Sequence, residues 1–251
     1  MTASGVDENL WMRQFHPAPG AKVRLVCLPH AGGSAPYFFP VSKALSPALD
    51  VVAVQYPGRQ DRRDEPGIDN IADLADAVTD ALLPWADRPL IIFGHSMGAT
   101  LAFEVALRLE AKGIVPLAVF ASGRRAPSRH RDEQVHLRSD DDLIREIQSL
   151  SGTQAAVLGD EEILRMVLPA IRSDYKAAET YRYETGPKLQ APIQAHFGVD
   201  DPKVSADEAR AWEEHTTGTF ELQTYPGGHF YLNQQAARVI DAIARVASTV
   251  A

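Results

Sequence analysis

Residues 90–99 read LIIFGHSMGA, and this short stretch decides the fold. It holds an apolar run, Leu90–Phe93, followed by the pattern Gly-x-Ser-x-Gly centred on Ser96 and then by a helix-forming segment. A strand that enters a tight turn and leaves it as a helix presents the serine hydroxyl at the edge of a sheet. Side chains at Gly94 and Gly98 would strike the backbone of so tight a turn. The stretch therefore predicts a nucleophile elbow at Ser96.

The rest of the chain alternates strand-length apolar runs with helix-length segments. Runs that are apolar throughout suit parallel strands covered on both faces. The expected strands are 23–28, 51–55, 90–93, 117–121, 193–197 and 220–225, the last at an edge because it alternates, and the expected core helices are 71–85, 99–112 and 236–247. The alternation predicts an α/β fold with a mostly parallel, doubly wound sheet.

Residues 124–186 interrupt this alternation because they contain no convincing strand. They show helical patterns over 142–150 and 163–181, with an expected kink at Pro169. The segment leaves the carboxyl end of a parallel strand, where α/β folds place their sites. We expect residues 1–123 and 187–251 to form one core, with 124–186 inserted as a helical lid.

The composition and net charge of the chain exclude several classes of function. The 251 residues carry a net charge of −8 and are 45% hydrophobic, as in an ordinary soluble globule. Such a charge argues against sequence-independent nucleic-acid binding, and no apolar run approaches the roughly 20 residues of a membrane span. The polar N-terminus lacks an apolar signal core, so we expect a cytoplasmic protein. A single cysteine, Cys27, excludes an internal disulfide and a cysteine-based metal cluster.

A serine nucleophile needs a base and an orienting acid. Of eight histidines, His229 fits best, because it follows the last strand in a glycine-rich turn and completes the chain order serine, acid, histidine. Asp200 and Asp201 both follow the strand before it, and turn chemistry alone does not choose between them.

Two backbone N–H groups are expected to stabilise the oxyanion. One is that of Met97, directly after the nucleophile. The other is assigned to Ala31, in the glycine-rich run Pro29–Ser34 that follows the first strand. This run does not match G-x-G-x-x-G, the pattern of dinucleotide binding.

Several motifs together resemble the type II thioesterases, stand-alone editing enzymes of polyketide and non-ribosomal peptide synthesis with the α/β-hydrolase fold. The matching stretches are LPHAGG at 28–33, QYPGR at 55–59, GHSMGA at 94–99, G-x-x-D-x-x-V at 198–204 and GGHFY at 227–231. The family pattern selects Asp201 over Asp200 as the acid. It also places a helical lid between the sixth and seventh strands, which corresponds here to residues 124–186.

The resemblance implies hydrolysis of acyl groups from the phosphopantetheine thiol of acyl or peptidyl carrier proteins, through Ser96, His229 and Asp201. No metal or redox cofactor is needed, and we expect a monomer. Three alternatives remain: a carboxylesterase or lipase-like hydrolase, an acyltransferase on small-molecule esters, and a non-catalytic hydrolase fold that binds a ligand.

Further site residues are expected around the same sheet edge. Arginines cluster after two strands, and Arg59, Arg62, Arg124 and Arg125 are candidates for binding an acidic carrier protein or its phosphate arm. Solvated charges paired with acidic neighbours are the alternative interpretation. Apolar lid positions, together with Met166 and Tyr175, are expected to line an acyl channel.

Overall fold

The computed structural model describes residues 8–151 and 161–250. Within them one sheet has seven strands in the order β1-β3-β2-β4-β5-β6-β7, all parallel except β1, which pairs antiparallel with β3. The strands are β1 Met12–Arg13, β2 Arg24–Leu28, β3 Asp50–Val54, β4 Leu90–His95, β5 Ala118–Ser122, β6 Ile193–Gly198 and β7 Phe220–Tyr225. The expected mostly parallel α/β sheet is confirmed, with β7 at an edge.

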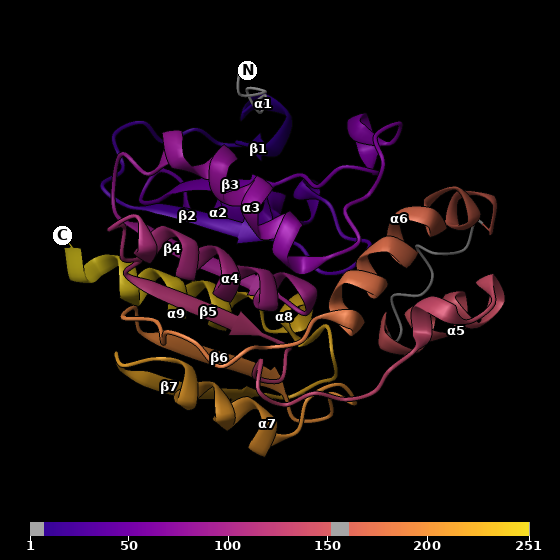
Figure 1. Cartoon of the computed structure of the whole chain (residues 1–251). Helices are drawn as coiled ribbons and strands as arrows, with labels where there is room; N and C mark the ends of the chain where they lie inside the picture. Colours follow the sequence, from indigo (N-terminus) through magenta and orange to yellow (C-terminus); the bar gives the residue numbers. More distant parts are fainter. Residues whose placement is uncertain (1–7, 152–160, 251) are drawn as a thin grey trace.

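Helices cover both faces of the sheet, which explains why the strands β2, β3, β4 and β5 are buried at every position. Successive residues of β4 alternate between two cores: Leu90 and Ile92 pack with α3 (Ile71–Leu82) and α4 (Met97–Ala111), whereas Ile91 and Phe93 pack with α2 (Phe39–Leu45) and α9 (Ala236–Ala247). This is the two-residue period of a strand buried on both sides. Figure 1 shows α4 in front of the sheet and α9 behind it.

Local signals fix where these helices begin and end. Asn70 caps α3, since its side chain accepts the Asp73 N–H at 3.0 Å. Gly113 follows α4 with a φ of +82°, in the left-handed region that ends many helices. The shorter helices are α1 Glu8–Trp11, α7 Ala206–Arg210 and α8 Tyr231–Gln234, and the 3-10 turns are η1 Ala35–Phe38, η2 Gln60–Arg62, η3 Leu83–Trp85, η4 Val135–Leu137, η6 Ala211–His215 and η7 Ser248–Val250.

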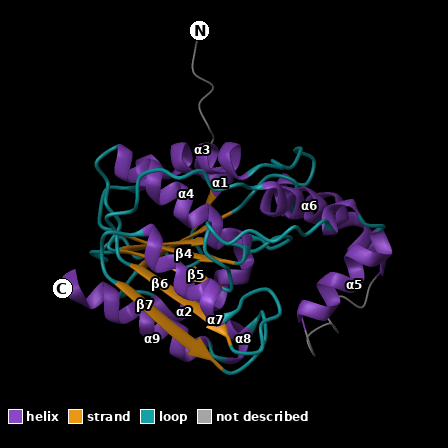
Figure 2. Cartoon of the chain, turned by 60° about the horizontal axis from the view of Figure 1, so that its bottom comes forward, coloured by secondary structure: helices purple, strands orange, loops and turns teal. Residues whose placement is uncertain are grey.

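Residues 124–186, here called the insertion, contain α5 (Asp140–Ser151) and α6 (Glu161–Thr180) and no strand among their described residues. In the described sheet the insertion connects the fifth and sixth strands, β5 and β6, and not the sixth and seventh. Pro169 lies within α6, which is a single helix on both sides of it. Figures 1 and 2 show α5 and α6 beyond the end of the sheet toward which the strands point.

No helix among the described residues is long and apolar enough to cross a membrane. Within the same ranges, no three His, Cys, Asp or Glu side chains are grouped so that they could hold a metal ion. The cysteine Cys27 is buried in β2 as a free thiol.

Candidate active site

Ser96 lies in the turn between β4 and α4, in a backbone conformation that non-glycine residues rarely adopt (φ 55°, ψ −119°). A Cβ on Gly94 would lie 1.9 Å from the carbonyl oxygen of Gly98, and one on Gly98 would lie 2.2 Å from that of Leu28, so both positions require glycine. The strained serine costs on the order of 1–3 kcal/mol, which the packing of β4 and α4 must offset. Its N–H donates to the Ser122 carbonyl at 2.8 Å. The main chain of Ser96 is therefore fixed, and its side chain makes no helix cap.

Ser96, His229 and Asp201 form an unbroken row of hydrogen bonds. His229 Nδ1 lies 2.9 and 3.1 Å from the two carboxylate oxygens of Asp201, and His229 Nε2 lies 3.0 Å from Ser96 Oγ. A carboxylate only accepts hydrogen bonds, so Nδ1 carries the proton. In a neutral ring Nε2 is then unprotonated and accepts the hydroxyl hydrogen of Ser96. This is the arrangement in which a histidine can take a proton from serine.

Asp201 and His229 meet because β6 and β7, the strands that precede them, end side by side. The Asp200 N–H donates to the Gly227 carbonyl at 3.0 Å, which joins the two loops. Gly198 permits this approach, since a Cβ there would lie 2.3 Å from the Gly227 oxygen. Asp201 is only 7% exposed, whereas Asp200 is exposed to solvent. The structure thus brings Asp201, and not Asp200, to His229.

The two predicted oxyanion donors lie around the same serine. Met97 is the first residue of α4, so its N–H has no acceptor within the helix. Ala31 lies in the loop after β2 and lines the same cavity as Ser96 and Met97. The positive end of the α4 dipole adds to the attraction for a negative charge at this point.

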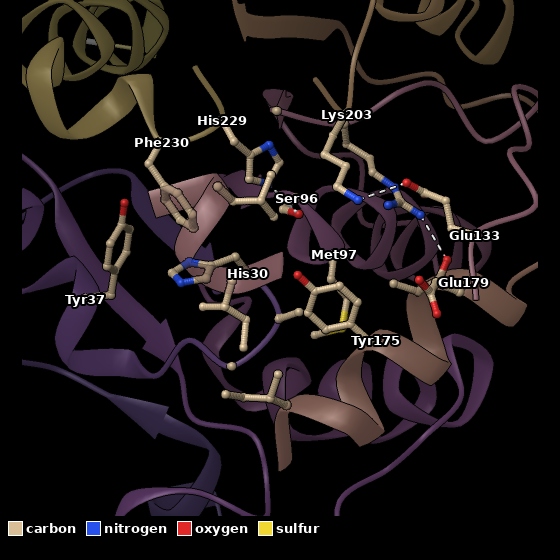
Figure 3. A pocket seen from close by; sticks show the side chains of 18 of the residues that line it. His30, Tyr37, Ser96, Met97, Glu133, Tyr175, Glu179, Lys203, His229 and Phe230 are labelled. Atoms are coloured by element: carbon tan, nitrogen blue, oxygen red, sulfur yellow. Dashed lines mark hydrogen bonds and ion pairs between the residues drawn. The ribbon is translucent and has the colours of Figure 1, made fainter. Parts of the chain in front are cut away.

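Ser96 faces a cavity of about 350 Å³ between the sheet edge and the insertion. Its volume is within the usual range for small-molecule sites. One wall is mainly apolar and comes from α5 and α6: Ile147, Leu150, Val167, Ile171, Tyr175 and Ala178. Figure 3 shows Tyr175 across from Ser96, and Lys203, Glu133 and Glu179 gathered at one side. The cavity therefore has an apolar part and a charged end.

His30 and His95 lie beside the His229 ring but remain uncharged at neutral pH. Burial lowers the pKa of His30 to about 3, with the charges of His229 and Arg59 adding to the effect. Burial likewise places the pKa of His95 well below its usual range, helped by His229 and His30. Both rings pack against Phe230, with centroid distances of 4.9 and 5.4 Å. They form neutral packing around His229, which leaves His229 as the histidine bonded to Ser96.

Three of the arginines expected to bind a carrier protein are buried in ion pairs, which corrects that expectation. Arg59, Arg62 and Arg125 are only 6%, 5% and 4% exposed. Their partners are Asp174 for Arg59, Glu65 for Arg62 and Glu133 for Arg125. A buried guanidinium is stable only when a carboxylate compensates it. These three side chains use their donors inside the fold and form no exposed docking patch.

Arg124 has different surroundings because it is half-buried and lines the cavity. Its guanidinium donates to the Thr100 hydroxyl at 3.1 Å and to the Ala178 carbonyl at 3.0 Å, both neutral groups. Burial and the neighbouring charge of Arg125 lower the pKa of Arg124 to about 10, so it stays charged at pH 7. Lys203, at the same end, is paired with carboxylates at 2.6 and 3.0 Å.

Sequence reasoning missed several residues that the fold brings to the cavity: Tyr37, Glu133, Glu179, Lys203, Phe230 and Asn233. Phe230 and Lys203 could have been found from the sequence, because each lies within two positions of a predicted site residue. Glu133 and Glu179 could not, since their place depends on how the insertion folds back. Met166 lies in α6, but its side chain is outside the part of the chain that the structure describes.

Known proteins match this chain over nearly its whole length. Residues 23–246 fit the family model of the thioesterase domain. The chain is 53% identical over 94% of its length to a probable cadicidin biosynthesis thioesterase of Streptomyces griseus, of which it spans 65%. It is also 53% identical over 92% of its length to thioesterase PikA5 of Streptomyces venezuelae, of which it spans 83%.

A solved structure agrees with these matches. The type II thioesterase BorB, from the borrelidin biosynthetic cluster, superposes with a TM-score of 0.91 at 53% identity, covering 95% of this chain and 98% of BorB. The likeness thus extends over the sheet, the elbow and the insertion. Together with the match to the family model, it shows that the chain belongs to the thioesterases and is a thioester hydrolase with the α/β-hydrolase fold.

Proposed function

We propose that this enzyme hydrolyses acyl thioesters on the phosphopantetheine arm of acyl or peptidyl carrier proteins, as an editing or release step in polyketide or non-ribosomal peptide synthesis. The observation that carries the proposal is the hydrogen-bonded row Ser96–His229–Asp201, which opens into a mainly apolar cavity. The relatives named for cadicidin and borrelidin biosynthesis support substrates of this class.

In the first half of the reaction, Ser96 Oγ attacks the thioester carbonyl carbon while His229 Nε2 takes the hydroxyl proton. The carbonyl oxygen becomes an oxyanion that accepts hydrogen bonds from the N–H groups of Ala31 and Met97. Asp201 accepts from Nδ1 and stabilises the imidazolium that forms. The carbon–sulfur bond then breaks, the pantetheine thiol leaves with the proton from His229, and the acyl group remains on Ser96 as an ester.

In the second half, water attacks the ester carbonyl while His229 takes a proton from it. The same two N–H groups hold the second oxyanion. When the bond to Ser96 Oγ breaks, the serine regains its proton from His229, and the carboxylic acid is released. Both halves use one base and one oxyanion site, so a single set of residues completes the cycle.

We propose that residues 124–186 act as a lid over the core formed by 1–123 and 187–251. The apolar side chains that α5 and α6 contribute to the cavity support this assignment, because an acyl chain needs such a wall. Movement of a lid would control entry of the acyl arm. The row Ser96–His229–Asp201 is complete within one copy of the chain, so the proposed reaction needs no residue from a second copy, and we propose that the enzyme acts as a monomer.

We propose further that Arg124 binds the phosphate of the pantetheine arm. Its hydrogen bonds within the fold go to neutral groups, and it stays charged at the charged end of the cavity. A guanidinium can bind a phosphate through two parallel hydrogen bonds. The nearby carboxylates of Glu133 and Glu179 would weaken the binding of any phosphate at this end, so the rest of the arm must supply most of the affinity.

Intact-mass analysis of carrier proteins loaded with a panel of acyl groups tests the proposed function. We expect each acyl mass to disappear with wild-type enzyme, at a rate that falls by about 10³-fold or more in Ser96→Ala. Equal or faster turnover of simple oxygen esters would favour a carboxylesterase instead. Transfer of the acyl mass to an added alcohol or amine would favour an acyltransferase.

A further inference from the structure

The QYPGR motif at 55–59 has no part in the proposed reaction, yet three of its side chains hold the loop that carries Ala31. Gln55 Oε1 accepts the Ala35 N–H at 2.8 Å, the Tyr56 hydroxyl donates to the Pro29 carbonyl at 3.1 Å, and Arg59 Nη1 donates to the Gly33 carbonyl at 3.2 Å. These side chains are 1%, 1% and 6% exposed. Buried hydrogen bonds of this kind fix the geometry of the groups they join.

Asp174 reaches the same loop from α6 and is 1% exposed. Its two oxygens accept from Arg59 at 2.8 and 2.6 Å, and Oδ2 also accepts the Gly32 N–H at 2.7 Å. Bidentate, charge-assisted hydrogen bonds are among the strongest and most directional in proteins. One carboxylate of the insertion therefore joins the QYPGR motif to the loop after β2.

These contacts surround the peptide unit that carries the Ala31 N–H. The Pro29 carbonyl belongs to the preceding unit and the Gly32 N–H to the following one, and both are bonded to buried side chains. Within the unit itself, the His30 carbonyl accepts the Gly33 N–H at 2.8 Å. Because a trans peptide is planar, fixing this carbonyl also fixes the direction of the Ala31 N–H.

Arg59 also balances the charge that Asp174 brings to the site. An uncompensated carboxylate bonded to Gly32 would oppose a negative charge developing beside Ala31. The Arg59 guanidinium lies against both carboxylate oxygens and 5.1 Å from the centroid of the Tyr56 ring. Removing either member of the pair would leave the other as a buried, unpaired charge.

We infer that Asp174 and Arg59 are positioning residues, which hold the Ala31 N–H toward the oxyanion and so connect the insertion to the chemistry at Ser96. The inference rests on the proposed function, because it assumes that Ala31 serves as an oxyanion donor. Neither residue needs to touch the substrate. Their effect should therefore appear in transition-state stabilisation and not in substrate binding.

Asp174→Asn tests this inference, because it keeps the shape and removes the charge. With a short acyl thioester of N-acetylcysteamine we expect kcat to fall about 10- to 100-fold, less than the 10²–10³ lost with an entire oxyanion donor. KM should stay within about threefold. The affinity for an alkyl boronic acid, which adds to Ser96 as a tetrahedral anion, should fall by a similar factor to kcat.

Asp69→Asn is the matched control, since Asp69 pairs with Lys176 of the same helix α6 but at the surface. It should leave kcat and the boronate affinity unchanged. Tyr56→Phe is a milder second variant that removes only the hydrogen bond to Pro29. We expect it to lower kcat and boronate affinity together, by about 3- to 10-fold, even if Asp174→Asn fails to fold.

Unchanged kcat in folded Asp174→Asn would overturn the inference, and so would a lower kcat with unchanged boronate affinity in either variant. Wild-type enzyme and Ser96→Ala are measured alongside. If wild type has no thioesterase activity, or Ser96→Ala retains it, the proposed function fails. An active wild type with insensitive Asp174 and Tyr56 variants contradicts the positioning role alone.

Discussion

Asp200 and Asp201 are neighbours in sequence, but only Asp201 is buried against His229. We expect Asp201→Asn to lower kcat by about 10²- to 10⁴-fold, because the amide permits the wrong tautomer of His229. Asp200→Asn, at an exposed position, should stay within about threefold of wild type. Steady-state kinetics on one soluble thioester would measure both, and the opposite ranking would identify Asp200 as the acid.

Arg124 supplies a second test at the scale of single residues. Arg124→Gln should raise KM for carrier-bound substrate by about tenfold, because one charge-assisted phosphate contact is lost. The short thioester of N-acetylcysteamine has no phosphate, so its kinetics should not change. Arg129→Gln, whose side chain is exposed and paired with Glu214, serves as the control. Equal losses with both substrates would mean that Arg124 has a structural role.

Chain order predicted Ser96 and His229, because each follows a strand at one sheet edge, and it narrowed the acid to Asp200 or Asp201. The choice of Asp201 came from the family pattern. The sequence could not predict the surroundings of Arg59. Arg59 is bonded to Asp174, a residue 115 positions away whose place depends on the fold of the insertion. Charges with partners so distant in sequence look like a solvated cluster until the fold is known.

At the scale of elements, α6 contributes Val167 to the wall of the cavity. A larger side chain there should shorten the acyl chain that fits. We expect Val167→Trp to lower kcat/KM for a ten-carbon acyl thioester at least tenfold relative to a three-carbon one, because overpacking displaces the longer chain. Lys176→Trp, on the exposed side of the same helix, should leave the ratio unchanged. A Val167→Trp ratio equal to that of wild type would contradict the proposed acyl wall.

The sequence predicted the strands best where both faces of the strand are buried. Each central strand lies within about one or two positions of its expected range, because its apolar run is bounded by polar residues or turns. The two-residue β1 was missed, since it is too short to show any period. The helix α2 was also missed; it starts at Phe39-Pro40, and its seven residues give only a weak pattern.

For the whole molecule, buried histidines make stability depend on pH. Burial is the main cause that lowers the pKa of His30 to about 3 and those of His196 and His215 to about 4. In the unfolded chain these histidines bind protons as the pH falls below about 6.5, whereas in the folded chain they stay neutral. The free energy of unfolding is therefore highest above pH 7 and decreases as the pH drops toward 4. Each of these histidines should lower the free energy of unfolding by roughly 1 to 2 kcal/mol at pH 5 relative to neutral pH.

Thermal unfolding at pH 7.5, 6 and 5 would measure this dependence. His196 does not line the cavity. It lies in β6, and its Nδ1 is 3.0 Å from the hydroxyl oxygen of Tyr225. His196→Gln should therefore reduce the drop in Tm between pH 7.5 and 5 while retaining activity. A drop as large as that of wild type would show that other groups control the acid sensitivity.

The hydrogen bond from Gly32 to Asp174 makes the reactivity of Ser96 conditional on where α6 rests. An acyl group too bulky for α6 to settle over the loop would enter the cavity and still escape cleavage. Acyl groups of different size would then differ in kcat while their KM values stay similar. Such an enzyme could sample every intermediate of an assembly line and cut only those small enough to be enclosed.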